Sequence, residues 1–338
     1  MRKQFMNLQT LKLDRSVETL LELALMTPVQ DFLSRPGKKI RTQIVELGYA
    51  FSDTRVAAGP PSPTEKVLCE KAAELLETLH AGSLVIDDIQ DGSRIRRGKP
   101  SLHVTYGLPV ALNAGNWMYF WPLQKIGALG VSDKTELALY RLFNDVMLKA
   151  HYGQALDVGI RIDEVPQENV FKLCMSSIEL KSGALMSLAI SLGATLAQAS
   201  PERIGVLQDF GNSFGTALQM YDDIGNFCAA PSKEPLDYTK RFEDLYLRRP
   251  SWIWAVAATE CTSQVYQALV DAVWRLPDES FLKPWIEIHQ IVPKSKARAK
   301  AHLSKCLDGL NHHLPPEPTS SGFVQLRELS SFLERVYV

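Results

Sequence analysis

The stretch that decides the fold, residues 79–107, reads LHAGSLVIDDIQDGSRIRRGKPSLHVTYG. Its first part continues a pattern of apolar residues three and four positions apart, which is typical of an α-helix. The helical pattern runs into Asp87, Asp88 and Asp91 and then stops at a segment with glycine and proline. The stretch therefore predicts a long helix that ends in carboxylates and is followed by a basic loop.

The rest of the chain has the same helical periodicity and almost no strand signals. Prolines mark helix boundaries, Pro28 and Pro293 among them, while Pro122 falls inside a predicted helix. None of the interruptions has the length or composition of a domain linker. We therefore expect one all-α domain over residues 1–338, a helical bundle around a central cavity. The predicted helices span residues 15–26, 38–52, 64–90, 107–129, 132–158, 166–194, 202–228, 251–275, 283–290, 293–309 and 322–336.

The composition is that of an ordinary globular protein, with 338 residues, 46% of them hydrophobic, and 37 basic against 38 acidic side chains. A net charge of -1 argues against nucleic-acid binding, which needs a basic surface. The five cysteines form no Cys-x-x-Cys pair, so a zinc site is not predicted and a reducing compartment fits best. The sequence shows no signal peptide and no window with the ~18 uninterrupted apolar residues of a spanning helix. We therefore expect a cytoplasmic protein without a transmembrane segment.

A second acidic group, Asp222-Asp223-Ile224-Gly225-Asn226, also follows an apolar helical run. Residues four apart share a helix face, so Asp87 projects with Asp91, and Asp222 with Asn226. Either group alone could be a solvated helix end, although the helix dipole disfavours carboxylates there. Two such groups indicate a strongly positive ligand between them. Mg²⁺ fits, because it takes one or two carboxylates together with the phosphate oxygens of a substrate.

Basic residues flank both acidic groups. Taken singly, each could be a solvated surface residue. Together they suit a dense anion such as a diphosphate, which arginine forks and lysine point charges bind. Metal ions and diphosphate beside apolar helix faces suggest a prenyl diphosphate substrate. The basic residues are Lys38, Lys39, Arg41, Arg94, Arg96, Arg97 and Lys99 around the first group, and Lys181, Lys240, Arg248 and Arg249 near the second.

Five ordered motifs resemble those of the trans-isoprenyl (polyprenyl) diphosphate synthases. Residues 79–107 contain the family's His, Asp-Asp-x-x-Asp and Arg-Arg-Gly-x-Pro in order. Residues 106–129, YGLPVALNAGNWMYFWPLQKIGAL, are particularly similar to the eukaryotic-type geranylgeranyl diphosphate synthases. The other motifs are Gly37-Lys38-x-x-Arg41, Gly153-Gln154-Ala155-Leu156-Asp157, Lys181-Ser182-Gly183 and Gln219-x-x-Asp222-Asp223.

The resemblance implies the all-α isoprenoid (terpenoid) synthase fold and a Mg²⁺-dependent prenyltransferase. Such an enzyme condenses isopentenyl diphosphate with an allylic diphosphate. The resemblance implies geranylgeranyl diphosphate as the product and a homodimer as the assembly. Three Mg²⁺ ions are implied, two bound by Asp87 and Asp91 and a third by Asp222, with Asp88 and Asp223 in support.

The resemblance also implies which side chains meet the substrates. The metals and cations would stabilise the charge of the leaving diphosphate, and the proton would pass to the released diphosphate, so no protein base is needed. Arg248-Arg249 stands where the family usually has Gly-Lys, Ser182 where threonine is common, and Asn226 where many members have a third aspartate. The implied contacts are Arg96, Lys181, Lys240 and the lid residue Arg249 for the allylic diphosphate, Lys38, Arg41, His80 and Arg97 for isopentenyl diphosphate, and Gln219 and Ser182 for the developing cation.

Two alternatives stay open. A terpene cyclase on the same fold would keep the aspartates but would not need Lys38, Arg41 and His80. A noncatalytic subunit of a heteromeric synthase usually loses carboxylates of the first group, which are all present here.

The length of the product depends on residues one turn before Asp87. Gly82 and Ser83 are small, and we expect them to face an apolar tunnel that accepts more than a farnesyl chain. Bulky aromatic residues commonly occupy this turn in family members that stop at farnesyl diphosphate. The aromatic run of Trp117, Phe120 and Trp121 is either ordinary core or the floor of that tunnel.

Overall fold

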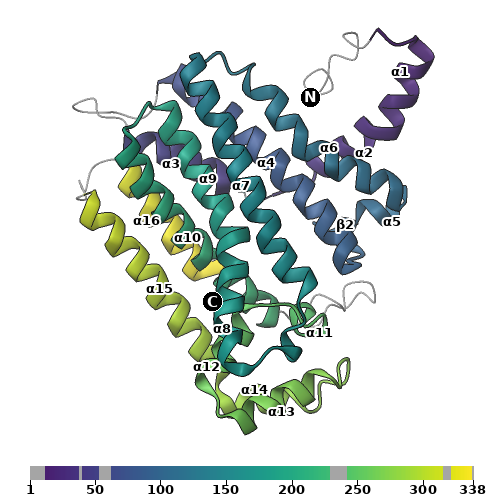
Figure 1. Ribbon diagram of the computed structural model, residues 1–338, viewed down its shortest axis with the longest axis vertical. Helices are drawn as coiled ribbons and strands as arrows, with labels where there is room; N and C mark the ends of the chain where they lie inside the picture. The colour runs from purple at the N-terminus through teal and green to yellow at the C-terminus, as the bar shows by residue number, and fades with distance from the viewer. Residues whose placement is uncertain (1–11, 38–39, 53–61, 229–241, 315–320, 337–338) are drawn as a thin grey trace. The chain divides into compact units, whose positions relative to one another are not determined.

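The computed structural model describes residues 12–37, 40–52, 62–228, 242–314 and 321–336. In these ranges the chain is almost entirely helical (Figure 1). The strands among the described residues are β1 (Ile95–Arg96) and β2 (Lys99–Pro100), which form a short antiparallel hairpin. The predicted all-α architecture is confirmed.

Residue contacts divide the chain into two compact units. Unit 1 comprises residues 1–40 and 74–129, and unit 2 comprises residues 41–73 and 130–338. Helix α4 (Pro63–Asp91) begins in unit 2 and ends in unit 1. The prediction of a single domain over residues 1–338 stays a prediction.

Unit 1 is built around the crossing of the C-terminal part of α4 with α6. A Cβ atom on Gly82 would lie 2.8 Å from the carbonyl oxygen of Gly115, and one on Gly115 would lie 2.8 Å from Cδ1 of Ile86. These helices can approach so closely only because both positions lack a side chain. Besides α4 and the hairpin, unit 1 contains α1 (Arg15–Leu21), the π-helical turn η2 (Glu22–Met26), α2 (Thr27–Leu33), α5 (Leu102–Tyr106) and α6 (Leu108–Ile126).

Unit 2 has α9 (Ala184–Leu196) at its core, since eleven of its 13 residues are buried. α9 packs against α7 (Asp133–Gly159) and α10 (Pro201–Cys228), and α10 packs in turn against α15 (Ile291–His313). The remaining elements are α3 (Ile40–Ser52), η3 (Ile162–Glu164), α8 (Gln167–Ile178), the π-helical turn η4 (Glu179–Gly183), α11 (Glu243–Tyr246), α12 (Trp252–Glu260), α13 (Ser263–Val273), α14 (Leu282–His289) and α16 (Ser321–Val336).

One helical run of the described chain, Gln167–Leu196, is long and apolar enough to cross a membrane, with a mean hydropathy of 1.3. It consists of α8, η4 and α9, and 50% of its most apolar window is buried in the structure. A core helix of a globular unit passes the same test of length and composition. The burial of α9 inside unit 2 fits that explanation.

The predicted helix over residues 15–26 continues to Leu33, so the boundary predicted at Pro28 is wrong. The backbone widens into η2 just before this proline, and the amide of Thr27 bonds to the carbonyl of Glu22, five residues earlier. Pro28 then occupies the first turn of α2, where its missing N–H costs little.

Two other predicted boundaries also shift. α15 begins at Ile291, two residues before the predicted start at Pro293, which therefore lies in the first turn of the helix. The helix predicted over residues 251–275 breaks at Cys261, whose backbone is extended, and resumes after Thr262. Pro122 lies inside α6 as predicted.

Candidate functional site

The first acidic group lies at the C-terminal end of α4 in unit 1. Asp87 and Asp91 are half-buried there, while the side chain of Asp88 is only 1% exposed. Asp87 and Asp91, four residues apart, therefore present oxygen atoms that a ligand can reach. Asp88 points into the protein instead.

Asp88 is held by Arg96 of the hairpin. The Nε and Nη2 atoms of Arg96 lie 2.7 and 2.6 Å from Oδ1 of Asp88, and Nη2 lies 3.8 Å from Asp87. Burial raises the pKa of Asp88, and the Arg96 guanidinium opposes that rise. Asp88 thus orients Arg96, and the ion pair connects the hairpin to the end of α4.

The hairpin turns at Arg97 and Gly98, which both have positive φ, at 56° and 74°. A two-residue hairpin turn of type I′ requires a positive φ at both of its central residues. Glycine meets this requirement without cost, whereas an arginine in this region is strained by about 1–2 kcal/mol. The guanidinium carbon of Arg97 lies 5.6 Å from the ring centre of the fully buried Phe32. Arg97, which is predicted to bind substrate, therefore has a strained backbone, and its side chain is held in place by Phe32.

Two further side chains of unit 1 belong to the same region. His80 lies on α4 two turns before Asp87 and is half-buried. Tyr119 on α6 was not predicted as a site residue. Burial, and then the negative charge of Asp87, raise the pKa of Tyr119 to about 12. Tyr119 is therefore a neutral hydroxyl in the neighbourhood of the first acidic group.

In unit 2, Lys181 pairs with Asp157, and their Nζ and Oδ2 atoms are 2.6 Å apart. Lys181 and Ser182 lie in η4, a π-helical turn of the kind frequently found at functional sites. A Cβ on Gly153 would lie 2.8 Å from Cγ of Lys181, so α7 must have glycine there to pack against η4. The predicted Gly153–Asp157 motif therefore has a structural explanation: its glycine allows the approach and its aspartate holds the lysine.

A chain of hydrogen bonds links η4 to the second acidic group. The hydroxyl of Ser182 donates to Oε1 of Gln219 at 2.5 Å, and Nε2 of Gln219 donates to Asp223 at 2.7 Å. The other oxygen of Asp223 accepts the backbone amide of Trp252 at 2.7 Å. Burial raises the pKa of Asp223, although these hydrogen bonds act to lower it. Asp222 is half-buried, so Asp223 orients Gln219 while Asp222 is the more accessible carboxylate.

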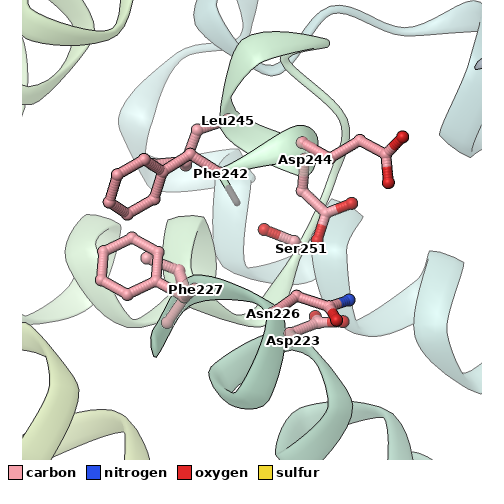
Figure 2. Close-up of a pocket in the computed structure, with 9 residues that line it drawn as sticks. Asp223, Asn226, Phe227, Phe242, Asp244, Leu245 and Ser251 are labelled. Carbon is pink, nitrogen blue, oxygen red and sulfur yellow. The ribbon is translucent and has the colours of Figure 1, made fainter. Parts of the chain in front are cut away.

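Figure 2 shows the pocket beside this second group. Asp223 and Asn226 at the end of α10 lie opposite Asp244 of α11, with Ser251 between them. The rings of Phe227 and Phe242 close one side, with centroids 5.0 Å apart at 72°. The cavity is about 10 Å³, which is the size of a single water molecule. It cannot hold a prenyl chain.

Arg248 stands in the predicted lid where the family usually has glycine. Its φ is 57°, which explains why glycine suits this position. Here the arginine is supported, because its guanidinium lies 4.3 Å from the ring centre of Trp274 and 4.0 Å from the buried Asp163. The next residue, Arg249, donates to the carbonyl oxygen of Asp157 at 3.1 Å. Arg249 is thereby fixed next to the residue that holds Lys181.

The prediction that Gly82 faces a product tunnel is wrong, because Gly82 packs directly against α6. Ser83 is half-buried and bonds to the carbonyl of His80, so it remains a candidate for the tunnel wall. Trp121 is buried and its ring is tilted by 38° against that of Trp117, with centroids 6.1 Å apart. Phe120 is 68% exposed, so it does not form part of an enclosed floor within unit 1.

Among the described residues, no three His, Cys, Asp or Glu side chains are grouped to hold a metal ion by themselves. Mg²⁺ does not require such a cage, because it often takes one or two carboxylates and completes its shell with water and phosphate oxygens. Asp87 and Asp91 supply hard oxygen atoms on one half-exposed face. They fit an Mg²⁺ ion that is shared with a diphosphate.

The predicted ligands Lys38 and Lys240 lie outside the described residues. Arg41 is half-buried at the start of α3, in unit 2. Within unit 1 the structure brings Asp87, Asp88 and Arg96 together, and within unit 2 it brings together Lys181, Ser182, Gln219 and the lid residue Arg249. The roles assigned to these residues stay predictions.

The fold is shared with the isoprenyl diphosphate synthases. The chain superposes on the geranylgeranyl pyrophosphate synthase of Corynebacterium glutamicum, solved with isoprenyl diphosphate and magnesium, with a TM-score of 0.78. That alignment covers 98% of this chain and 96% of the other at 20% identity, which establishes the fold class.

The sequence model of the polyprenyl synthetase family matches residues 22–280, and the chain belongs to this family. The predicted family is thus confirmed. The short chain isoprenyl diphosphate synthase of Methanothermobacter thermautotrophicus is 31% identical over 214 residues, or 63% of this chain. The geranylgeranyl pyrophosphate synthase of Eremothecium gossypii is 31% identical over 211 residues, or 61% of this chain. The matched region spans 61% of the length of each of these two relatives.

Proposed function

We propose that this protein is a Mg²⁺-dependent trans-prenyltransferase that condenses isopentenyl diphosphate with an allylic diphosphate. The observation that carries the proposal is the end of α4, where Asp87 and Asp91 lie half-buried beside the arginine hairpin. Two accessible carboxylates and adjacent guanidiniums suit a metal-bound diphosphate. Family membership and the geranylgeranyl diphosphate synthases among the relatives favour geranylgeranyl diphosphate as the product.

In the proposed mechanism Asp87 and Asp91 would hold two Mg²⁺ ions, and Asp222 would hold a third. Bound there, Mg²⁺ supplies positive charge that stabilises the departing diphosphate more in the transition state than in the ground state. Arg96, Lys181, Lys240 and Arg249 bind the same diphosphate.

Isopentenyl diphosphate is held by Lys38, Arg41, His80 and Arg97 in this proposal. When the carbon–oxygen bond of the allylic substrate breaks, the bonding electrons leave with the diphosphate. The double bond of isopentenyl diphosphate then attacks the allylic carbon, and the proton lost afterwards passes to the released diphosphate. The Ser182–Gln219–Asp223 chain fixes polar oxygen atoms beside the developing cation.

We further propose that the enzyme is a cytoplasmic homodimer. The five cysteines form no Cys-x-x-Cys pair, which suits a reducing compartment. α6 exposes Leu112 and Phe120, and α7 exposes Leu148 and Tyr152, and a second copy of the chain would cover such apolar side chains. Light scattering of the purified protein should give twice the mass of the 37.8 kDa chain. A monomeric mass at micromolar concentration would contradict the dimer.

The reaction is tested by incubating the purified chain and Mg²⁺ with isopentenyl diphosphate and, in turn, dimethylallyl, geranyl and farnesyl diphosphate. Mass spectrometry of the dephosphorylated products should show mainly geranylgeraniol, and chelation of Mg²⁺ should stop the reaction. A cyclic hydrocarbon formed without isopentenyl diphosphate would instead identify a terpene cyclase. No product from any starter would favour a noncatalytic subunit.

A further inference from the structure

An ion pair between a buried arginine and a half-buried aspartate lies at the end of α2, and the proposed reaction does not use it. Arg35 and Asp31 lie one helical turn apart, and Nη2 of Arg35 is 3.0 Å from Oδ2 of Asp31. The side chain of Arg35 is 1% exposed, so it cannot touch a substrate. Because burying two charges costs nearly as much as their attraction returns, such a pair is weak evidence of a contribution to stability. Its geometry indicates another role.

Arg35 reaches from α2 to the hairpin. Its Nη1 atom donates to the carbonyl oxygen of Arg96 at 3.2 Å. The bond joins the backbone of the hairpin one residue before the strained Arg97. The side chain of Arg96 has its own anchor in Asp88, so Arg35 fixes the backbone from which Arg97 projects.

Phe32 completes the contact between α2 and the hairpin. Its ring is fully buried, and the guanidinium carbons of Arg35 and Arg97 lie 5.3 and 5.6 Å from its centre. A guanidinium on an aromatic face is held by cation–π attraction as well as by packing. Phe32 is thus a common platform for the buried arginine and for the predicted substrate ligand.

Asp31 keeps Arg35 in place and contacts the hairpin a second time. Oδ1 of Asp31 lies 3.7 Å from Nζ of Lys99, on the strand after the turn. Burial, and then the negative charge of Asp31, raise the pKa of Tyr106. Both strands of the hairpin are therefore tied to the last turn of α2.

We propose that Asp31, Phe32 and Arg35 are positioning residues that hold Arg97 for the diphosphate of isopentenyl diphosphate. The proposal rests on the proposed function, which gives Arg97 this substrate. The side chain of Arg96 is fixed independently by Asp88, so the allylic site keeps its geometry when the support on α2 is lost. Substitutions of these residues should therefore weaken the binding of isopentenyl diphosphate and leave that of the allylic diphosphate unchanged.

The test compares the purified full-length enzyme with Arg35→Met, which keeps the apolar stem and removes the guanidinium. The Michaelis constant for isopentenyl diphosphate should rise about tenfold or more, as expected when a binding group is misplaced. The constant for the allylic diphosphate should stay within about twofold, since the Arg96–Asp88 pair is intact. Arg35→Lys should recover part of the loss because it restores the charge without the fork.

Arg203→Met is the matched control. Arg203 also donates from its side chain to a backbone carbonyl, that of Phe51 at 3.1 Å, but within unit 2. The Arg203→Met variant should have an altered melting temperature, but the ratio of its Michaelis constants for the two substrates should be that of the wild type. Phe32→Leu provides a second variant that keeps the charges, and it should also act on isopentenyl diphosphate alone.

Equal changes for both substrates, or none, in Arg35→Met and Phe32→Leu would overturn the proposal. If Arg35→Met does not fold, Arg35→Lys and Phe32→Leu decide the question. Isopentenyl diphosphate binding to the unmodified enzyme is measured by calorimetry in the same series. An unmodified enzyme that neither binds nor converts this substrate would refute the proposed function, whereas normal binding with an unaffected Arg35→Met would refute only the positioning role.

Discussion

At the scale of single residues, neighbouring aspartates differ in whether a ligand can reach them. Asp87 and Asp91 are half-buried and open to a ligand, whereas Asp88 is buried and paired with Arg96. The same division recurs at Asp222 and Asp223, of which the second is buried and bonded to Gln219. In each group an accessible carboxylate is next to a buried one, because neighbouring residues point about 100° apart around the helix.

Substitution of Asp87 or Asp91 by alanine should reduce kcat by about 10²-fold or more, because a group that stabilises transition-state charge is lost. The melting temperature without Mg²⁺ should be almost unchanged, since neither side chain is buried. Glu70→Ala, an exposed carboxylate on the same helix, is the control and should keep full activity. Wild-type rates in either aspartate variant at saturating Mg²⁺ would exclude it as a metal ligand.

Substitution of Arg96 by methionine should destabilise the protein by about 3 kcal/mol, because it leaves the charge of Asp88 buried without its partner. Asp88→Asn combined with Arg96→Met should recover most of that loss, since both charges are then absent. Urea unfolding of the single and double variants measures the coupling. Additive losses would show that the pair contributes nothing beyond its separate side chains.

At the scale of elements, close helix packing positions the reactive groups. Gly153 lets α7 approach η4, and this places Asp157, one turn later, against Lys181. In unit 1, α4 and α6 cross at Gly82 and Gly115. The glycines of these motifs therefore serve packing, and the charged residues next to them depend on that packing.

Gly153→Ala should cost about 1–3 kcal/mol of stability, because its Cβ would overlap with Lys181. It should also lower kcat by about tenfold or more, since small misplacements of charged groups have large effects on rate. Gly159→Ala lies on the same helix with open space around its Cβ and is the matched control. Equal behaviour of the two variants in thermal melts and turnover assays would disprove the packing role of Gly153.

At the scale of the whole molecule, the length of the product depends on where the apolar wall lies. Gly82 packs against α6 and Phe120 is exposed, so neither lines an enclosed tunnel. Of the residues predicted for the wall and the floor, Ser83 and the buried Trp121 remain candidates. Ser83→Phe should shift the product from geranylgeranyl to farnesyl diphosphate. The added ring meets the growing chain one isoprene unit earlier.

Trp121→Ala, which opens a cavity in unit 1, should shift the product toward longer chains. Mass spectrometry of the dephosphorylated products gives the distribution for both variants. The same distribution as wild type in Ser83→Phe would show that the chain does not pass this turn of α4.

The sequence by itself determined the helical class, most helix positions, the two acidic groups and the family. These features are local, because a helical period or a motif such as Asp-Asp-x-x-Asp is complete within a few residues. It also pointed to Lys181, Gln219 and Asp222 through such motifs. Local spacing correctly predicted that Asp87 and Asp91 share a helix face.

Only the tertiary structure decided which face of each helix is buried. Asp88 turns inward to Arg96, Gly82 packs against α6, and Lys181 meets Asp157 from 24 positions away. Arg35 was not predicted, although its spacing from Asp31 allows an ion pair, because nothing local shows that both reach the hairpin 61 residues later. Helical spacing shows which residues share a face, but it does not show which neighbour that face will contact. Packing between segments far apart in the chain decides those contacts.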